Sequence, residues 1–114
     1  MSQALAFRAY RAASAHRGPR EQEADVFRRV TGALRAAQHG TALDQTRALA
    51  DNSRLWLMVG DLLRDPDNAL PPGLRASIVS VGQALQREMR QAAPDFAFLI
   101  SVNEDITAGL SGRP

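Results

Sequence analysis

The sequence predicts an all-α protein, a small single-domain bundle of about five helices spanning residues 1–114. Apolar residues recur at helical spacing in about five segments, and none alternates apolar and polar residues as a half-buried strand would. Glycine and proline stand between these segments, where helices end or begin. A chain of 114 residues can bury a hydrophobic core without disulfides, and this one contains no cysteine.

The first predicted helix runs from Gln3 to Ala15 and ends at the cap sequence His16-Arg17-Gly18-Pro19. We expect residues 1–18 either to dock on the bundle or to swing free until a partner arrives. The second predicted helix begins at Pro19, which suits a first turn, and ends before His39-Gly40. Its buried stripe is expected to contain Phe27, Val30, Leu34 and Ala37.

The third predicted helix opens at Thr41, because this side chain can cap a helix together with Asp44 three residues on. Its stripe is expected to contain Leu43, Thr46, Leu49, Ser53, Trp56, Gly60 and Leu63. The apolar residues that widen this stripe late in the helix are Leu55, Met58, Val59 and Leu62. The late part of the helix is therefore expected either to be centrally buried or to offer a surface to a partner.

A rigid loop is predicted from Asp65 to Pro72, because its prolines restrict the backbone and Asp65 and Asn68 can bond neighbouring backbone groups. The fourth helix is predicted over residues 73–92. Its expected stripe is Leu74, Ile78, Val81, Leu85 and Met89. Gly60 and Gly82 lie on or beside stripes, where a missing side chain lets helices approach closely.

The fifth helix is predicted over residues 95–110, and residues 111–114 are expected to form a frayed end. Its expected stripe is Phe96, Leu99, Val102, Ile106 and Leu110.

The composition is typical of a soluble globular protein, with 45% apolar and 23% charged residues. All 14 basic residues are arginine, and the net charge is only +2. Residues 1–38 hold seven arginines against three acids, whereas residues 39–114 hold seven against nine. The first third could therefore face an acidic partner or phosphate, or it is a solvated helix surface. No apolar run approaches the length of a membrane span, so we expect a cytoplasmic protein.

The chain offers little that could support catalysis. Its two histidines, His16 and His39, stand before glycine at predicted helix ends and are interpreted as cap residues. No histidine or carboxylate spacing suits a transition metal, and the loop around Asp65 lacks the glycine and glutamate of a calcium loop. We therefore expect no enzyme activity, no metal and no cofactor.

Six residues are candidates for partner binding. Trp56 is expected to anchor the core with its N–H bonded nearby, or to lie in the floor of a groove with Asn52 and Arg54 at the rim. Asn103 stands among apolar residues, so it either fixes helix register or meets a partner's backbone. Asn68 in the loop and Arg20 in the arginine-rich first third complete the set.

Several short motifs occur in order along nearly the whole chain. They are Ala9-Tyr10, Pro19-Arg20-Glu21-Gln22-Glu23, Asn52-Ser53-Arg54-Leu55-Trp56, the loop Asp65-Pro66-Asp67-Asn68-Ala69-Leu70-Pro71, and Leu99-Ile100-Ser101-Val102-Asn103. With these motifs the chain resembles the flagellar biosynthesis regulator FlaF family of alphaproteobacteria. It departs from the family pattern at Gly82-Gln83-Ala84-Leu85, near where relatives often carry an aromatic residue.

This resemblance implies a role in flagellum biogenesis and organisation. FlaF-like proteins act with flagellin and are coupled to a second regulator, FlbT, which is linked to flagellin messenger RNA. The chain is thus expected to bind the amphipathic terminal helices of flagellin as a cytosolic secretion chaperone, and to couple flagellin synthesis to export. FlbT is a second candidate partner.

Two other roles remain open. The first is an RNA-associated regulator of flagellin expression that would use Arg8, Arg11 and Arg20. Direct nucleic-acid contact is disfavoured, because aromatic residues make up only 5% of the chain. The second is a structural subunit of a flagellar regulatory complex.

Overall fold

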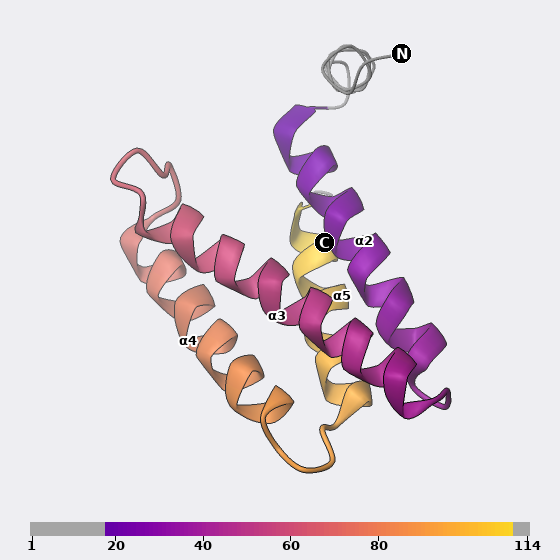
Figure 1. The fold of residues 1–114 in the computed structure, drawn as a ribbon. Coiled ribbons are helices and arrows are strands. Elements are labelled where there is room, and N and C mark those ends of the chain that lie inside the picture. Colours follow the sequence, from indigo (N-terminus) through magenta and orange to yellow (C-terminus); the bar gives the residue numbers. More distant parts are fainter. Residues whose placement is uncertain (1–17, 111–114) are drawn as a thin grey trace, which may run out of the picture.

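The computed structural model describes residues 18–110, with side chains from Gln22 onward. Within this part the chain forms four helices and no strand, which confirms the all-α class (Figure 1). The helices are α2 (Gly18–Ala37), α3 (Ala42–Arg64), α4 (Pro72–Met89) and α5 (Phe96–Leu110). The predicted helix over residues 3–15 and the predicted frayed end at 111–114 lie outside the described residues.

Local chemistry fixes most helix ends where the sequence predicted them. Thr41 caps α3, because its hydroxyl accepts a hydrogen bond from the backbone N–H of Asp44 at 3.1 Å. Asp95 does the same for α5 by accepting from the N–H of Phe98 at 3.0 Å. In the loop after α3, Asp65 accepts from the N–H of Asp67 at 2.9 Å. The predicted cap and the turn-forming role of this loop are therefore confirmed.

The predicted end of the fourth helix is wrong by three residues, since α4 ends at Met89 and not at Ala92. The backbone N–H of Arg90 bonds the carbonyl of Arg87 at 3.2 Å, which tightens the last turn and stops the helix. Glu88 then accepts the N–H of Asp95 at 2.9 Å and holds the connection to α5.

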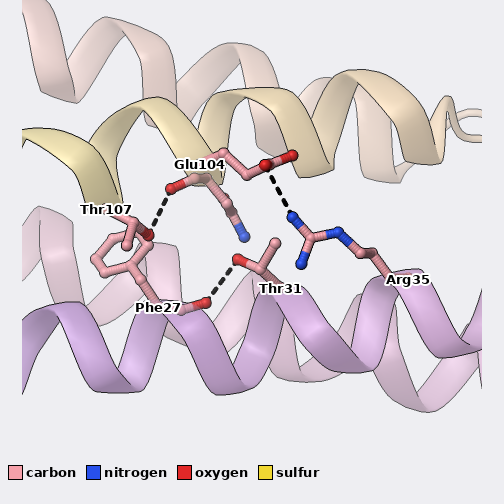
Figure 2. A network of polar contacts seen from close by, with 6 residues as sticks. Phe27, Thr31, Arg35, Glu104 and Thr107 are labelled. Carbon is pink, nitrogen blue, oxygen red and sulfur yellow. Dashed lines mark hydrogen bonds and ion pairs between the residues drawn. The ribbon is translucent and has the colours of Figure 1, made fainter.

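Helix α2 packs closely against α5, and the two run antiparallel (Figure 1). Figure 2 shows that polar side chains accompany this contact, with Arg35 of α2 in an ion pair with Glu104 of α5 at 2.9 Å. On the facing sides, Thr31 and Thr107 each donate to a carbonyl one turn earlier on their own helix, at 2.6 and 2.8 Å. These bonds satisfy the hydroxyls within each helix, so the threonines can pack between helices.

Helix α3 lies between the α2–α5 pair and α4, and α4 packs principally on α3 (Figure 1). Leu34, Leu85 and Leu99 are fully buried, one from each of the outer helices. The rings of Phe27 and Trp56 meet edge-to-face with centroids 5.7 Å apart, which joins α2 to α3 in the core. None of the helices described here is long and apolar enough to cross a membrane.

The stripe predicted for the third helix is wrong at its start, because Leu43 and Thr46 are exposed. The buried residues of α3 are Ala48, Asn52, Leu55, Trp56 and Leu63. In the first half of α3 the buried positions are Ala48 and Asn52, each one residue before the predicted Leu49 and Ser53. Alanine and asparagine occupy these positions, and a pattern that searches for large apolar residues does not detect them. Leu74 of α4 is likewise exposed, although the sequence predicted it to be buried.

Candidate functional site

A chain of buried amide groups joins three helices next to Trp56. The indole N–H of Trp56 donates to Oδ1 of Asn103 at 3.0 Å. Nδ2 of Asn103 donates to Oδ1 of Asn52 at 2.8 Å, and Nδ2 of Asn52 reaches the sulfur of Met89 at 3.5 Å. This network therefore runs from α5 through α3 to α4, and both asparagines are fully buried.

The network bears on the alternatives predicted for these residues. Trp56 is a core anchor with a satisfied N–H, as predicted, and its ring also lines the groove described below. Asn103 is bonded inside the molecule, so the structure supports its register-fixing role. The predicted position of Asn52 at a rim is wrong, because this side chain is fully buried. A buried amide needs partners, and Asn52 finds them only between helices.

A second set of contacts holds α4 against α3. Ser53 donates to Oε1 of Gln86 at 2.9 Å, and Nε2 of Gln86 donates to the carbonyl of Ser53 at 3.0 Å. A methyl group added at Gly82 would lie 3.1 Å from Cε3 of Trp56, so the absence of a side chain permits this contact. The predicted close approach at Gly82 is confirmed. At Gly60 the nearest atom is the flexible guanidinium of Arg64, at 3.2 Å, and not another helix.

A groove with a volume of about 300 Å³ lies along the contact between α3 and α4. Its apolar part is lined by Trp56, Leu57, Leu63, Ile78 and Val79. Its polar part is lined by Arg64, Gln83, Gln86, Arg87 and Arg90. No carboxylate of the described residues lines it, so the groove combines apolar surface with positive charge. We call this the α3–α4 groove.

Large apolar side chains remain exposed around the same two helices. Leu57 and Met58 are each 60% exposed, Leu62 is 54% exposed, and Leu74 is 47% exposed. Helix α3 is thus apolar on more than one side in its late part, as predicted. Leu55, Trp56 and Leu63 bury one side, while Leu57, Met58 and Leu62 leave another open. Exposed clusters of this kind commonly mark interaction surfaces.

Of the other candidate residues, Arg54 and Asn68 do not line the groove. Arg54 is exposed and forms an ion pair with Asp51 on its own helix. Asn68 organises the loop, because Nδ2 donates to the carbonyl of Leu62 at 2.9 Å and Oδ1 accepts from the N–H of Leu70 at 3.0 Å. The side chain of Arg20 lies outside the described ones, as do Arg8 and Arg11, on which the predicted RNA role depended. Partner binding by these candidates stays a prediction.

Sequence reasoning missed the polar wall of the groove. Gln83, Gln86, Arg87 and Arg90 recur at spacings of three and four residues, which places them on one face of α4. That spacing was visible in the sequence, and it lies beside the apolar stripe through Ile78 and Leu85. The sequence did not show that α3 leaves this polar face of α4 uncovered.

The fold and the groove define a small all-α protein with an amphipathic, arginine-lined groove between two of its helices. The family model described as flagellar protein FlaF matches residues 6–110 of the chain. The chain therefore belongs to the FlaF family of flagellar proteins, as the sequence motifs indicated. No curated protein and no solved structure matches it.

Proposed function

We propose that this protein binds flagellin in the cytoplasm as a secretion chaperone, and that it acts by binding and catalyses no reaction. Membership of a flagellar family supports a role in flagellum biogenesis. The observation that carries the proposal is the α3–α4 groove, whose apolar lining includes the exposed side chain of Leu57. A groove of this kind suits a partner that presents the apolar face of an amphipathic helix.

The terminal helices of flagellin are the proposed occupants. Such helices carry an apolar stripe that must be shielded before assembly. Fully burying a leucine or methionine side chain stabilises a complex by about 1.5–3 kcal/mol. Covering the exposed part of Leu57 and of the half-buried Ile78 and Val79 therefore supplies a favourable term, from which the ordering costs of binding are subtracted.

The same binding event can couple flagellin synthesis to export. Unexported flagellin would occupy the groove, and release at the export gate would free it. The ratio of occupied to free protein would then report how much flagellin awaits export. FlbT is the proposed partner that reads this ratio.

Co-elution of the purified protein with purified flagellin on size exclusion tests the proposal. We expect a stable complex with the wild-type protein, and its loss with Leu57→Glu. Leu43→Glu is the matched control, because Leu43 lies on the same helix and is 58% exposed against 60% for Leu57, but does not line the groove. If the wild-type protein never co-elutes with flagellin, the proposal is contradicted. If Leu57→Glu and Leu43→Glu weaken the complex equally, the groove is not the flagellin site.

A further inference from the structure

We propose that the α3–α4 groove selects a helix whose apolar stripe is flanked by carboxylates, so that it recognises an acidic amphipathic segment of flagellin. This inference rests on the proposed function and specifies the chemistry of the partner. It follows from the charges that line the groove.

Arg64, Arg87 and Arg90 line the groove, and no acidic side chain from Gln22 to Leu110 lines it with them. Arg87 and Arg90 are exposed and form no ion pair within the described part of the chain. Arg64 lies 3.6 Å from the carboxylate of Asp61, in a pair whose side chains are 65% and 83% exposed. An ion pair that is this long and this exposed contributes little to stability. Arg64 can therefore leave Asp61 and pair with a carboxylate of the partner.

The acidic residue between these arginines does not neutralise them. Glu88 directs its carboxylate to the backbone N–H of Asp95 in the connection before α5, at 2.9 Å. Elsewhere in the described part, Arg35 and Arg54 each have a carboxylate partner on the protein itself. The groove thus keeps positive charge unpaired next to apolar surface.

The length of the groove fits a helix. Its α4 wall runs from Ile78 to Arg90, a rise of about 18 Å at 1.5 Å per residue. An incoming helix of roughly 12 residues, or just over three turns, has the same length. Arg87 and Arg90 lie at one end of this wall, so carboxylates spaced by one turn at the matching end of the partner would meet both.

Charge complementarity of this kind chiefly raises the association rate and selects among partners, and it weakens with salt. The apolar floor supplies affinity, and the arginines decide which amphipathic helix is held and in which direction. A helix with lysines or arginines at these places would be repelled.

The test compares two double variants by their affinity for full-length monomeric flagellin, measured by isothermal titration calorimetry at low and moderate salt. Arg87→Glu with Arg90→Glu reverses charge in the groove. Arg29→Glu with Arg47→Glu is the matched control, because these arginines are also exposed, form no ion pair among the described residues, and lie outside the groove. Both pairs lower the net charge by the same amount, so any general attraction changes equally.

We expect the groove variant to raise Kd by about tenfold or more and to flatten its salt dependence, and the control to stay within about threefold of wild type. Arg87→Gln with Arg90→Gln should fall between wild type and the charge reversal. Circular dichroism and thermal unfolding should show that all variants fold, since every substituted side chain is exposed.

The outcomes separate this inference from the function on which it rests. Wild-type binding with equal losses in the two double variants, or with no loss in the groove variant, would overturn the inference and leave flagellin binding standing. No binding by the wild-type protein would overturn both. The same variants are also titrated with a 20-nucleotide single-stranded RNA. Binding of this RNA through Arg87 and Arg90, with flagellin affinity unaffected by them, would assign the groove to nucleic acid instead.

Discussion

The indole N–H of Trp56 donates to the side-chain carbonyl of Asn103 at 3.0 Å, and this bond joins α3 to α5 inside the core. It also sets the orientation of the amides that follow. Because Oδ1 of Asn103 faces the indole, its Nδ2 faces Asn52, and Nδ2 of Asn52 in turn faces Met89. One directional bond thus determines how three helices are linked.

Asn103→Ala should destabilise the protein by about 2–4 kcal/mol, because it leaves both the indole N–H of Trp56 and the side-chain oxygen of Asn52 buried without their hydrogen-bond partner. The free energy of unfolding in urea measures this loss. The matched comparison is Trp56→Phe combined with Asn103→Ala, which removes both ends of the Trp56–Asn103 bond. If the stability loss of the double variant equals the sum of the losses of Trp56→Phe and Asn103→Ala, the two side chains have no interaction energy and the expected contribution of this bond is contradicted.

Gly82→Ala and Gly32→Ala should change stability in opposite directions. Alanine improves helix propensity by roughly 1 kcal/mol at either position. At Gly32 no atom of the described residues lies within 4 Å of the added methyl, so the gain should be kept. At Gly82 the methyl would press on the buried ring of Trp56 at 3.1 Å, and overpacking of this kind costs about 1–3 kcal/mol. A stabilised Gly82→Ala variant in thermal unfolding would show that the ring can shift without cost.

Thr41→Ala should cost about 1 kcal/mol, because α3 loses the hydroxyl that caps it. Thr46→Ala is the control, since Thr46 is exposed inside the same helix and does not cap it. Its effect should stay within about 0.5 kcal/mol. Chemical denaturation of the two variants in parallel distinguishes the cap from the general effect of removing a threonine.

Leu85→Ala and Leu57→Ala should separate stability from binding. Leu85 is fully buried, so its truncation should cost about 2–5 kcal/mol of unfolding free energy. Leu57 is 60% exposed and lines the groove, so its truncation should leave stability within about 0.5 kcal/mol of wild type while weakening flagellin binding. Unfolding and flagellin titration of both variants check this. Unchanged flagellin affinity after Leu57→Ala would remove this residue from the proposed surface.

Local signals made most helix boundaries predictable. The Thr41 cap, the His39-Gly40 stop and the prolines before α4 act within a few residues, so the sequence contains their full physical cause. The end of α4 was missed because it depends on a tightened last turn and on the bond from Glu88 across the connection. No periodicity reports such contacts.

The inward face of α3 was missed for a different reason. Asn52 occupies a core position, and a polar residue there becomes favourable only once Asn103 and Met89 are beside it. Those neighbours are 51 and 37 residues away in the chain. For Asn103 the sequence left two possibilities, and only the placement of α3 against α5 distinguished them. The groove is likewise a product of helix placement, although the spacing of its α4 arginines was present in the sequence.

Helix α4 packs principally on α3, whereas α5 packs closely on α2 and is also hydrogen-bonded to α3 through Asn103. A segment held from one side opens more often than the rest of a fold. We therefore expect the amide protons of α4 to exchange with deuterated water sooner than those of α2 and α5. Because α4 supplies one wall of the groove, a partner helix bound there would slow the exchange of the α4 amide protons. The protein would then be more rigid in the complex than when it is free.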